Sequence, residues 1–282
     1  MQHPVPHHAA SRSARPALLL AAALWPCLLA LPMRAAYAAE LRQTTVHICD
    51  DGAEWPPYTY YKRVNGRPSA ELVGYSVDVI TAIFKKAGIA YTLQLLPWLR
   101  CQKEVAAGQR YQLALNASHS AERERDYFLS LPYYRTTNYY FYSRSAHPQG
   151  LHIEQLADLK RYRVCGLHGY NYATYGLASA EIDSGARNFS AVITKLQRGD
   201  CELFLEKYEV LAGFAALGQD MLSDPALGRQ PVPGMQPTEF HMLVSRQHEH
   251  GAELLRLINE GLRELQASQQ LRSMLAKYMT QP

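Results

Sequence analysis

Residues 76–116 read SVDVITAIFKKAGIAYTLQLLPWLRCQKEVAAGQRYQLALN. The first third of this stretch repeats apolar residues at the spacing of one helix face, and they are Val77, Ile80, Phe84 and Ala87. That spacing predicts an amphipathic helix over residues 76–87, and Gly88 is the expected stop because glycine readily adopts the left-handed conformation at a helix end.

The remainder of the stretch continues the alternation of strand and helix. Residues 91–96 and 112–116 are short, largely apolar runs that predict strands. Between them, residues 99–107 predict a second helix, which ends at a glycine. A strand over residues 45–49 precedes the stretch. The order β-α-β-α-β predicts a parallel, doubly wound sheet, and so an α/β fold class.

A similar series follows a tyrosine-rich segment at residues 133–142. It predicts strands over residues 162–166, 186–189 and 202–205, and helices over residues 171–179 and 191–198. The chain then ends with a predicted strand over 240–244, a helix carrying Leu254, Ile258, Leu262 and Leu265, and a last helix over 268–278. Two similar α/β lobes are the simplest interpretation.

The N-terminus has the pattern of an export signal. Arg12 and Arg15 precede an apolar run over residues 16–31, and Ala36-Tyr37-Ala38 matches a signal peptidase site. We therefore expect residues 1–38 to be a signal peptide cleaved after Ala38, and the protein to be periplasmic.

The composition excludes several classes of function. The formal charge of +4 is too small to indicate nucleic acid as a partner. The chain has neither a P-loop nor a G-x-S-x-G motif, and His248-Glu249-His250 does not have the spacing of a zinc site. We expect no cofactor, no metal and no catalytic residue.

The exported chain would contain four cysteines, namely Cys49, Cys101, Cys165 and Cys201. An even number in an exported protein allows two disulfides with three possible connectivities. Buried free thiols are an equally good interpretation of their wide spacing.

One stretch carries the resemblance to a known family. Residues 116–123 (NASHSAER) and 128–134 (FLSLPYY) resemble the S-x-T-x-x-R … F-S-x-P-Y signature of the periplasmic solute-binding proteins of family 3, with Ser120 in the threonine position. Supporting matches in the same order are WPPY at 55–58, GYSVD at 74–78 and GDCE at 199–202.

The resemblance implies a fold and a function. The fold is the type II periplasmic-binding-protein fold, with the ligand cleft at the hinge between two lobes. One lobe would comprise residues 39–138 plus 241–282, and the other residues 139–240. The function would be to capture a small carboxylated solute, an amino acid or a related compound, as a monomer. The partner would be the membrane permease of an ABC-type transporter, or a sensor.

The resemblance also assigns roles to single residues. Arg123 would grip the carboxylate of the ligand, since a guanidinium donates two parallel hydrogen bonds to a carboxylate. Other residues at family positions facing the ligand are Trp55, Trp98, Asn116, Ser118 and Asn171. Asp50 and Asp51 end the first strand, where either could accept from a ligand amine or cap the turn.

The acid that holds the ammonium group in amino-acid binders has two candidates in alignment. A one-residue gap places Glu206 there, and an ungapped alignment places Lys207 there. An inward Glu206 favours an amino-acid-like ligand, whereas an inward Lys207 favours a ligand with extra negative charge or no amine. An alternative function is that of a cyclohexadienyl-dehydratase-like enzyme on the same scaffold, with Glu206 as the acid, and another is a ligand-sensing module of a receptor.

Overall fold

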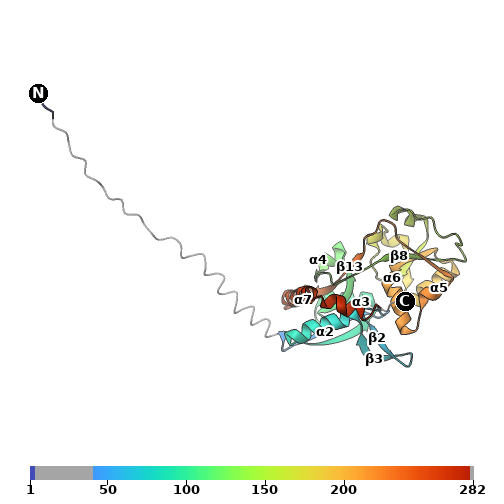
Figure 1. Cartoon of the computed structure of the whole chain (residues 1–282), viewed down its shortest axis with the longest axis horizontal. Helices are drawn as coiled ribbons and strands as arrows, with labels where there is room; N and C mark the ends of the chain where they lie inside the picture. Colours follow the sequence, from blue (N-terminus) through green and yellow to red (C-terminus); the bar gives the residue numbers. More distant parts are fainter. Residues whose placement is uncertain (4–40, 280–282) are drawn as a thin grey trace.

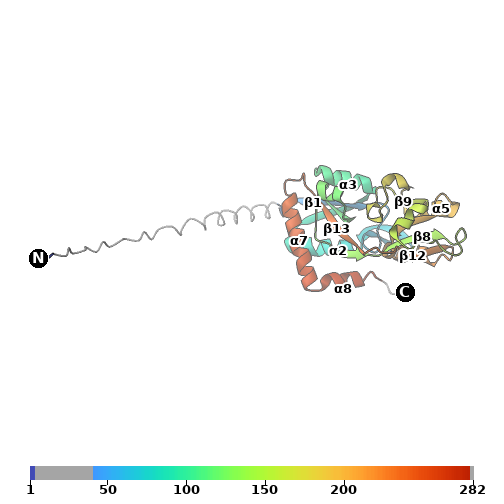
Figure 2. The ribbon, with the colours of Figure 1, turned by 90° about the horizontal axis from the view of Figure 1, so that it is seen from above.

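The computed structural model describes residues 1–3 and 41–279. Residues 41–279 form two α/β lobes, each built on its own sheet, which lie side by side (Figures 1 and 2). The cleavage site predicted after Ala38 and nearly all of the predicted signal peptide lie outside the described residues. Within the described ranges no helix is long and apolar enough to cross a membrane.

The first lobe contains the predicted parallel unit. Its strands, in spatial order, are β4 (Ala90–Leu96), β1 (Thr45–Asp51), β5 (Leu113–Ser118), β13 (Thr238–Ser245) and β6 (Tyr127–Leu129), and β7 (Tyr134–Thr136) also pairs with β13. β1 is parallel to both β4 and β5, as predicted, whereas β13 runs antiparallel to β5. The carboxyl ends of β1 and β5 therefore lie next to each other, the edge at which open α/β sheets bind ligands.

Helices α2 (Tyr75–Ala87) and α3 (Trp98–Ala107) connect these parallel strands, and each ends at the predicted glycine in the left-handed conformation. The buried face of α2 differs from the predicted one. Val79 and Ile83 are buried, whereas Val77 is only half-buried. The reason is that the stripe through positions 76, 79, 80, 83 and 84 carries more apolar surface than the stripe through Val77.

The second lobe repeats the parallel arrangement in its first half. Its strands, in spatial order, are β10 (Ile182–Ala186), β9 (Val164–Leu167), β11 (Leu203–Lys207), β8 (Asn138–Ser143) and β12 (Leu227–Pro231). β9 is parallel to β10 and β11, and β8 is antiparallel to β11 and β12. The predicted helix over 191–198 is α5 (Phe189–Arg198).

Two predictions in the second lobe were wrong. The helix expected over residues 171–179 is replaced by two 3₁₀ turns, η2 (Ala173–Tyr175) and η3 (Ser179–Glu181), and Gly176 with φ 68° interrupts the segment. The strand expected over 186–189 lies earlier, as β10, because the side chain of Asn188 caps α5 by accepting from the backbone N–H of Ala191.

Several elements were not predicted. They are the hairpin β2 (Tyr60–Val64) and β3 (Arg67–Val73), the strands β6, β7, β8 and β12, and the helical segments η1 (Leu156–Arg161), α6 (Tyr208–Gly213), η4 (Phe214–Leu217) and η5 (Met221–Ser223). The C-terminal helices α7 (Gly251–Ala267) and α8 (Gln270–Ala276) pack near α2 at the edge of the first lobe (Figure 2). The chain passes between the sheets twice, between β7 and β8 and between β12 and β13.

Both disulfides form, which decides the alternative left open by the sequence. Cys49 on β1 bonds to Cys101 on α3, and Cys165 on β9 bonds to Cys201 just before β11. Each bond therefore ties a strand to its neighbouring segment within one lobe. Neither joins the two lobes.

Candidate functional site

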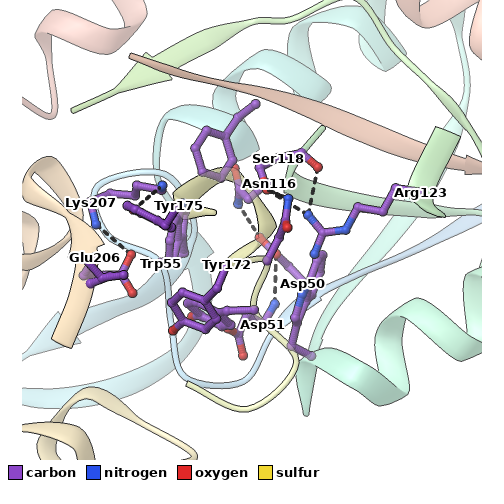
Figure 3. A pocket seen from close by; sticks show the side chains of 15 residues that line it. Asp50, Asp51, Trp55, Asn116, Ser118, Arg123, Tyr172, Tyr175, Glu206 and Lys207 are labelled. Atoms are coloured by element: carbon purple, nitrogen blue, oxygen red, sulfur yellow. Dashed lines mark hydrogen bonds between the residues drawn. The ribbon is translucent and has the colours of Figure 1, made fainter. Parts of the chain in front are cut away.

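A cavity of about 40 Å³ lies between the lobes, at the carboxyl ends of β1, β5 and β11 (Figure 3). Its lining residues are Asp50, Asp51, Trp55, Trp98, Asn116, Ser118, Arg123, Tyr170, Asn171, Tyr172, Tyr175, Leu205, Glu206, Lys207 and Phe240. All seven residues selected from the sequence as ligand contacts line this cavity.

Arg123 lies in the short helix α4 (Ala121–Asp126), whose N-cap is Ser120. Its guanidinium is buried, 6% exposed, and only Nη1 has a partner in the described part of the chain. Nη1 donates to the carbonyl oxygen and to Oγ of Ser118, at 2.8 and 3.0 Å. The ring of Trp98 lies 5.5 Å from Cζ. Nε and Nη2 therefore remain available to a ligand.

Burial lowers the pKa of Arg123 to about 10, and no carboxylate among the described residues forms an ion pair with it. The group is still charged at neutral pH. A buried cation without an anionic partner is costly, and the natural compensation is an anion from outside the chain.

Asn116 has a different role from the one its position suggested. It lines the cavity, but its carboxamide is fully bonded inside the first lobe. Oδ1 accepts from hydroxyl groups of Ser76, Tyr133 and Tyr134, and Nδ2 donates to Asp50 Oδ2 at 2.5 Å. Nδ2 also donates to Thr59 Oγ1 at 2.9 Å. These bonds use all of its donors and acceptors, so Asn116 positions Asp50.

The two acids at the end of β1 both face the cavity and both are buried. Asp50 accepts from Asn116 and from the backbone N–H of Asp51. Asp51 caps the following turn through the N–H of Ala53, and its Oδ2 accepts from Tyr170 at 2.6 Å. Burial raises the pKa of Asp50 to about 7 and that of Asp51 to about 6.

Tyr170 and Asn171 reach from the second lobe to the first. Asn171 Nδ2 donates to the carbonyl oxygen of His119 at 2.9 Å and to Ser118 Oγ at 3.3 Å. Together with the bond from Tyr170 to Asp51, these contacts hold the lobes closed over the cavity.

Glu206 and Lys207 both line the cavity, on the opposite side from Arg123 (Figure 3), but their charged ends are engaged differently. Lys207 Nζ donates to Asn138 Oδ1 at 2.5 Å and to Tyr175 OH at 2.9 Å. It also donates to Thr238 Oγ1 at 3.3 Å. Glu206 Oε1 accepts from the backbone N–H of Lys207 at 2.7 Å, and Oε2 has no bonded partner among the described residues. Burial raises the pKa of Glu206 and lowers that of Lys207.

Trp55 and Trp98 form the apolar walls. Trp55 is buried, its Nε1 donates to Tyr134 OH at 3.1 Å, and its ring packs against Tyr170, Phe189 and Phe240. The structure also places Tyr172, Tyr175, Leu205 and Phe240 at the cavity, which the sequence did not indicate. One signal could have found the tyrosines, since residues 170–175 read YNYATY in a chain that has 19 Tyr and only 7 Phe.

No group of three or more potential metal ligands occurs in residues 1–3 and 41–279. The lining of the cavity instead combines buried carboxyl groups, those of Asp50, Asp51 and Glu206, with the buried cations of Arg123 and Lys207.

Comparison with known proteins gives a family and a fold. The profile of the bacterial extracellular solute-binding proteins, family 3, matches residues 48–281. A search of curated proteins gives no match.

Among solved structures, an amino acid ABC transporter substrate-binding protein from Streptococcus pneumoniae, AbpA bound to L-arginine, is similar with a TM-score of 0.65 and 18% identity, covering 86% of this chain and 97% of that one. The ancestral amino acid-binding protein AncCDT-1, a precursor of cyclohexadienyl dehydratase, has a TM-score of 0.64 and 13% identity, covering 87% and 100%. A histidine kinase sensor domain with similarity to periplasmic binding proteins has a TM-score of 0.65 and 19% identity, covering 83% and 96%.

Proposed function

Since the chain belongs to the bacterial extracellular solute-binding proteins of family 3, we propose that it captures a small carboxylated solute, an amino acid or a close relative, in the cavity between its lobes. The observation that carries the proposal is Arg123, a buried guanidinium with two unused donor nitrogens and no anionic partner in the described chain. Two parallel N–H groups match the geometry of a carboxylate.

The other side of the cavity supports a positive group on the ligand. Glu206 has one carboxylate oxygen without a protein partner among the described residues, whereas the ammonium of Lys207 is already bonded to Asn138 on β8 and Tyr175 in η2. Of the two alternatives left open by the sequence, the geometry favours Glu206 as the contact. A zwitterion with its carboxylate at Arg123 and its ammonium at Glu206 would bring a partner to each unpaired group.

The ligand would stabilise the closed arrangement because only that arrangement contacts it from both lobes. Arg123 belongs to the first lobe and Glu206 to the second, so the ligand completes a bridge that Asn171 begins. We further propose that the lobes divide near residues 138 and 240, and that residues 1–38 direct export to the periplasm. The closed complex would be recognised by an ABC-type permease as a monomer.

A thermal-shift screen tests the proposal. The protein, purified and refolded to remove any carried ligand, is tested against the amino acids, opines and dicarboxylates. A ligand at one hundred times its dissociation constant adds about 2.7 kcal/mol to the free energy of unfolding. We expect carboxylated, amine-bearing compounds to raise the melting temperature, and their amides and N-acyl forms to have no effect. A response to uncarboxylated solutes alone would refute the proposal.

The same screen separates binding from catalysis. Glu206 is a buried acid whose pKa is raised by desolvation, as a general acid requires. Each compound that scores is incubated with the protein and analysed by mass spectrometry. An unchanged compound supports binding alone, whereas conversion beyond one equivalent, lost in Glu206→Gln, would establish a dehydratase-like enzyme instead.

A further inference from the structure

Tyr170 occupies the middle of the cleft. It comes from the second lobe, and its hydroxyl donates to Asp51 Oδ2 in the first lobe at 2.6 Å. Its ring packs edge-on against Trp55, with the ring centres 5.5 Å apart and the planes at 70°. One side chain therefore spans the space where a ligand between the lobes would lie.

The backbone before Tyr170 fixes its position. Gly169 has φ 81°, and a Cβ added to it would lie 2.6 Å from Leu99 Cγ. The turn is thus pressed against the first turn of α3, at a distance only glycine allows. The N–H of Tyr170 donates to the carbonyl oxygen of Leu167 at the end of β9, which closes the turn.

Two spaces of very different size meet at Tyr170. The inner cavity measures about 40 Å³, whereas an outer groove of about 880 Å³ lies beside it, between α3 and the ends of β9 and β10. Asp51, Trp98 and Tyr170 line both spaces. Of these three, Tyr170 is the one attached to a loop of the second lobe, and it is held against the first lobe by its contacts with Asp51 and Trp55.

We propose that Tyr170 is the residue that determines ligand size, by separating the inner cavity from the outer groove. This inference rests on the proposed function and deepens it, since it names compact amino acids, of the size of glycine, alanine and serine, as the ligand class. A longer side chain has to enter the groove, and to do so it must displace the ring from Trp55 and break the bond to Asp51. Compact ligands leave both contacts intact.

The experiment compares the wild type with Tyr170→Ala and Tyr170→Phe. Dissociation constants are measured by calorimetry for glycine, alanine and serine, and for glutamine, arginine and phenylalanine. We expect the wild type to bind only the compact group, and Tyr170→Ala to bind the long group at least about tenfold more tightly than the wild type does. Tyr170→Phe keeps the ring and so keeps the size limit. Equal size preference in the wild type and Tyr170→Ala would overturn the inference.

A second measurement needs no ligand. Acrylamide quenching reports access to Trp55 and Trp98, which are 5% and 7% exposed beside Tyr170. Any contribution of Trp25 is common to all variants and cancels in the comparison. The quenching constant should rise at least twofold in Tyr170→Ala and stay unchanged in Tyr170→Phe. Identical quenching in all three proteins would refute a barrier at Tyr170 even if no amino acid binds, which would itself count only against the proposed function.

Discussion

Replacing Arg123 with methionine should weaken ligand binding and yet leave the ligand-free protein as stable as before, or more stable. Burial lowers the pKa of Arg123 from 12.5 to about 10, a shift that corresponds to about 3 kcal/mol of cost for the charged form in the folded protein. The compensating bonds run from one nitrogen, Nη1, to two oxygens of one residue, Ser118, and we count them as a single charged-donor contact worth about 1.5–3 kcal/mol. The substitution should therefore change the free energy of unfolding by between about zero and +2 kcal/mol.

Urea denaturation at pH 7 measures this change, and a thermal scan should give a rise of about 2–4 °C for each kcal/mol. The matched control is Arg125→Met. Arg125 lies two residues away on the same helix, its side chain is 71% exposed and it pairs with Asp126, so its loss should matter by less than about 0.5 kcal/mol.

The ligand response moves in the opposite direction. Once the screen has found a ligand, Arg123→Met should lose about 2–5 kcal/mol of binding free energy, the range for removing one partner of a buried charge pair. A stabilised protein that no longer binds identifies a group retained for function. If Arg123→Met loses more than about 1 kcal/mol of stability without ligand, Arg123 is a structural residue and the reasoning is wrong.

Three further outcomes follow from the same contacts. Burial raises the pKa of Asp51 from 3.8 to about 6, so the folded state binds more protons than the unfolded state between these pH values, and the free energy of unfolding falls as pH rises from 4 to 6. In Asp51→Asn this fall should be smaller by up to about 3 kcal/mol. Identical urea-denaturation profiles for the two proteins at pH 4 and pH 6 would contradict the buried carboxylate. The Cys49–Cys101 and Cys165–Cys201 bonds close loops of 52 and 36 residues. Removing either bond by paired Cys→Ala substitution should lower the free energy of unfolding, measured in urea, by about 4 kcal/mol. A loss below about 1 kcal/mol would refute this expectation. Asn116→Ala leaves the hydrogen-bond partners of the carboxamide unpaired and places alanine at φ 58°, so we expect the free energy of unfolding to fall by about 3 kcal/mol or more. If the variant instead loses ligand affinity and keeps its stability, Asn116 is a ligand contact.

The sequence predicted the parallel units because their signals are local. Helices α2 and α3 have apolar stripes and a glycine stop, and each lies between two short apolar strands, so periodicity alone was enough. The segment over 171–179 has similar apolar content but folds as 3₁₀ turns, because two of its tyrosines are bonded to strands. The hydroxyl of Tyr172 accepts from the backbone N–H of Leu167, and that of Tyr175 donates to Asn138 Oδ1. Those partners lie on β9 and β8, and no window of sequence around residue 175 contains them both.

The site shows the same division. Arg123 and Ser118 are close in the sequence and share a motif, so their meeting at the cavity could be predicted. The choice between Glu206 and Lys207 could not, because it depends on Asn138 and Tyr175, which lie 69 and 32 residues from Lys207. A sequence alignment assigns a position along the chain. The direction of a side chain at the end of a strand depends instead on the residues that pack against it in the folded protein.

The two disulfides lie within the lobes, whereas the cavity-lining groups of Arg123 and Glu206 that lack a hydrogen-bond partner lie between the lobes. Each disulfide ties segments within one lobe, and each lobe has its own sheet, so neither disulfide constrains the two connections between the lobes. Among the described residues that line the cavity, Arg123 has two donor nitrogens and Glu206 one carboxylate oxygen without a hydrogen-bond partner, and these two residues lie on opposite lobes. Buried polar groups normally find a partner within the chain. A donor on one lobe and an acceptor on the other thus face the cavity without a protein partner, which is the arrangement that the proposed zwitterionic ligand would satisfy.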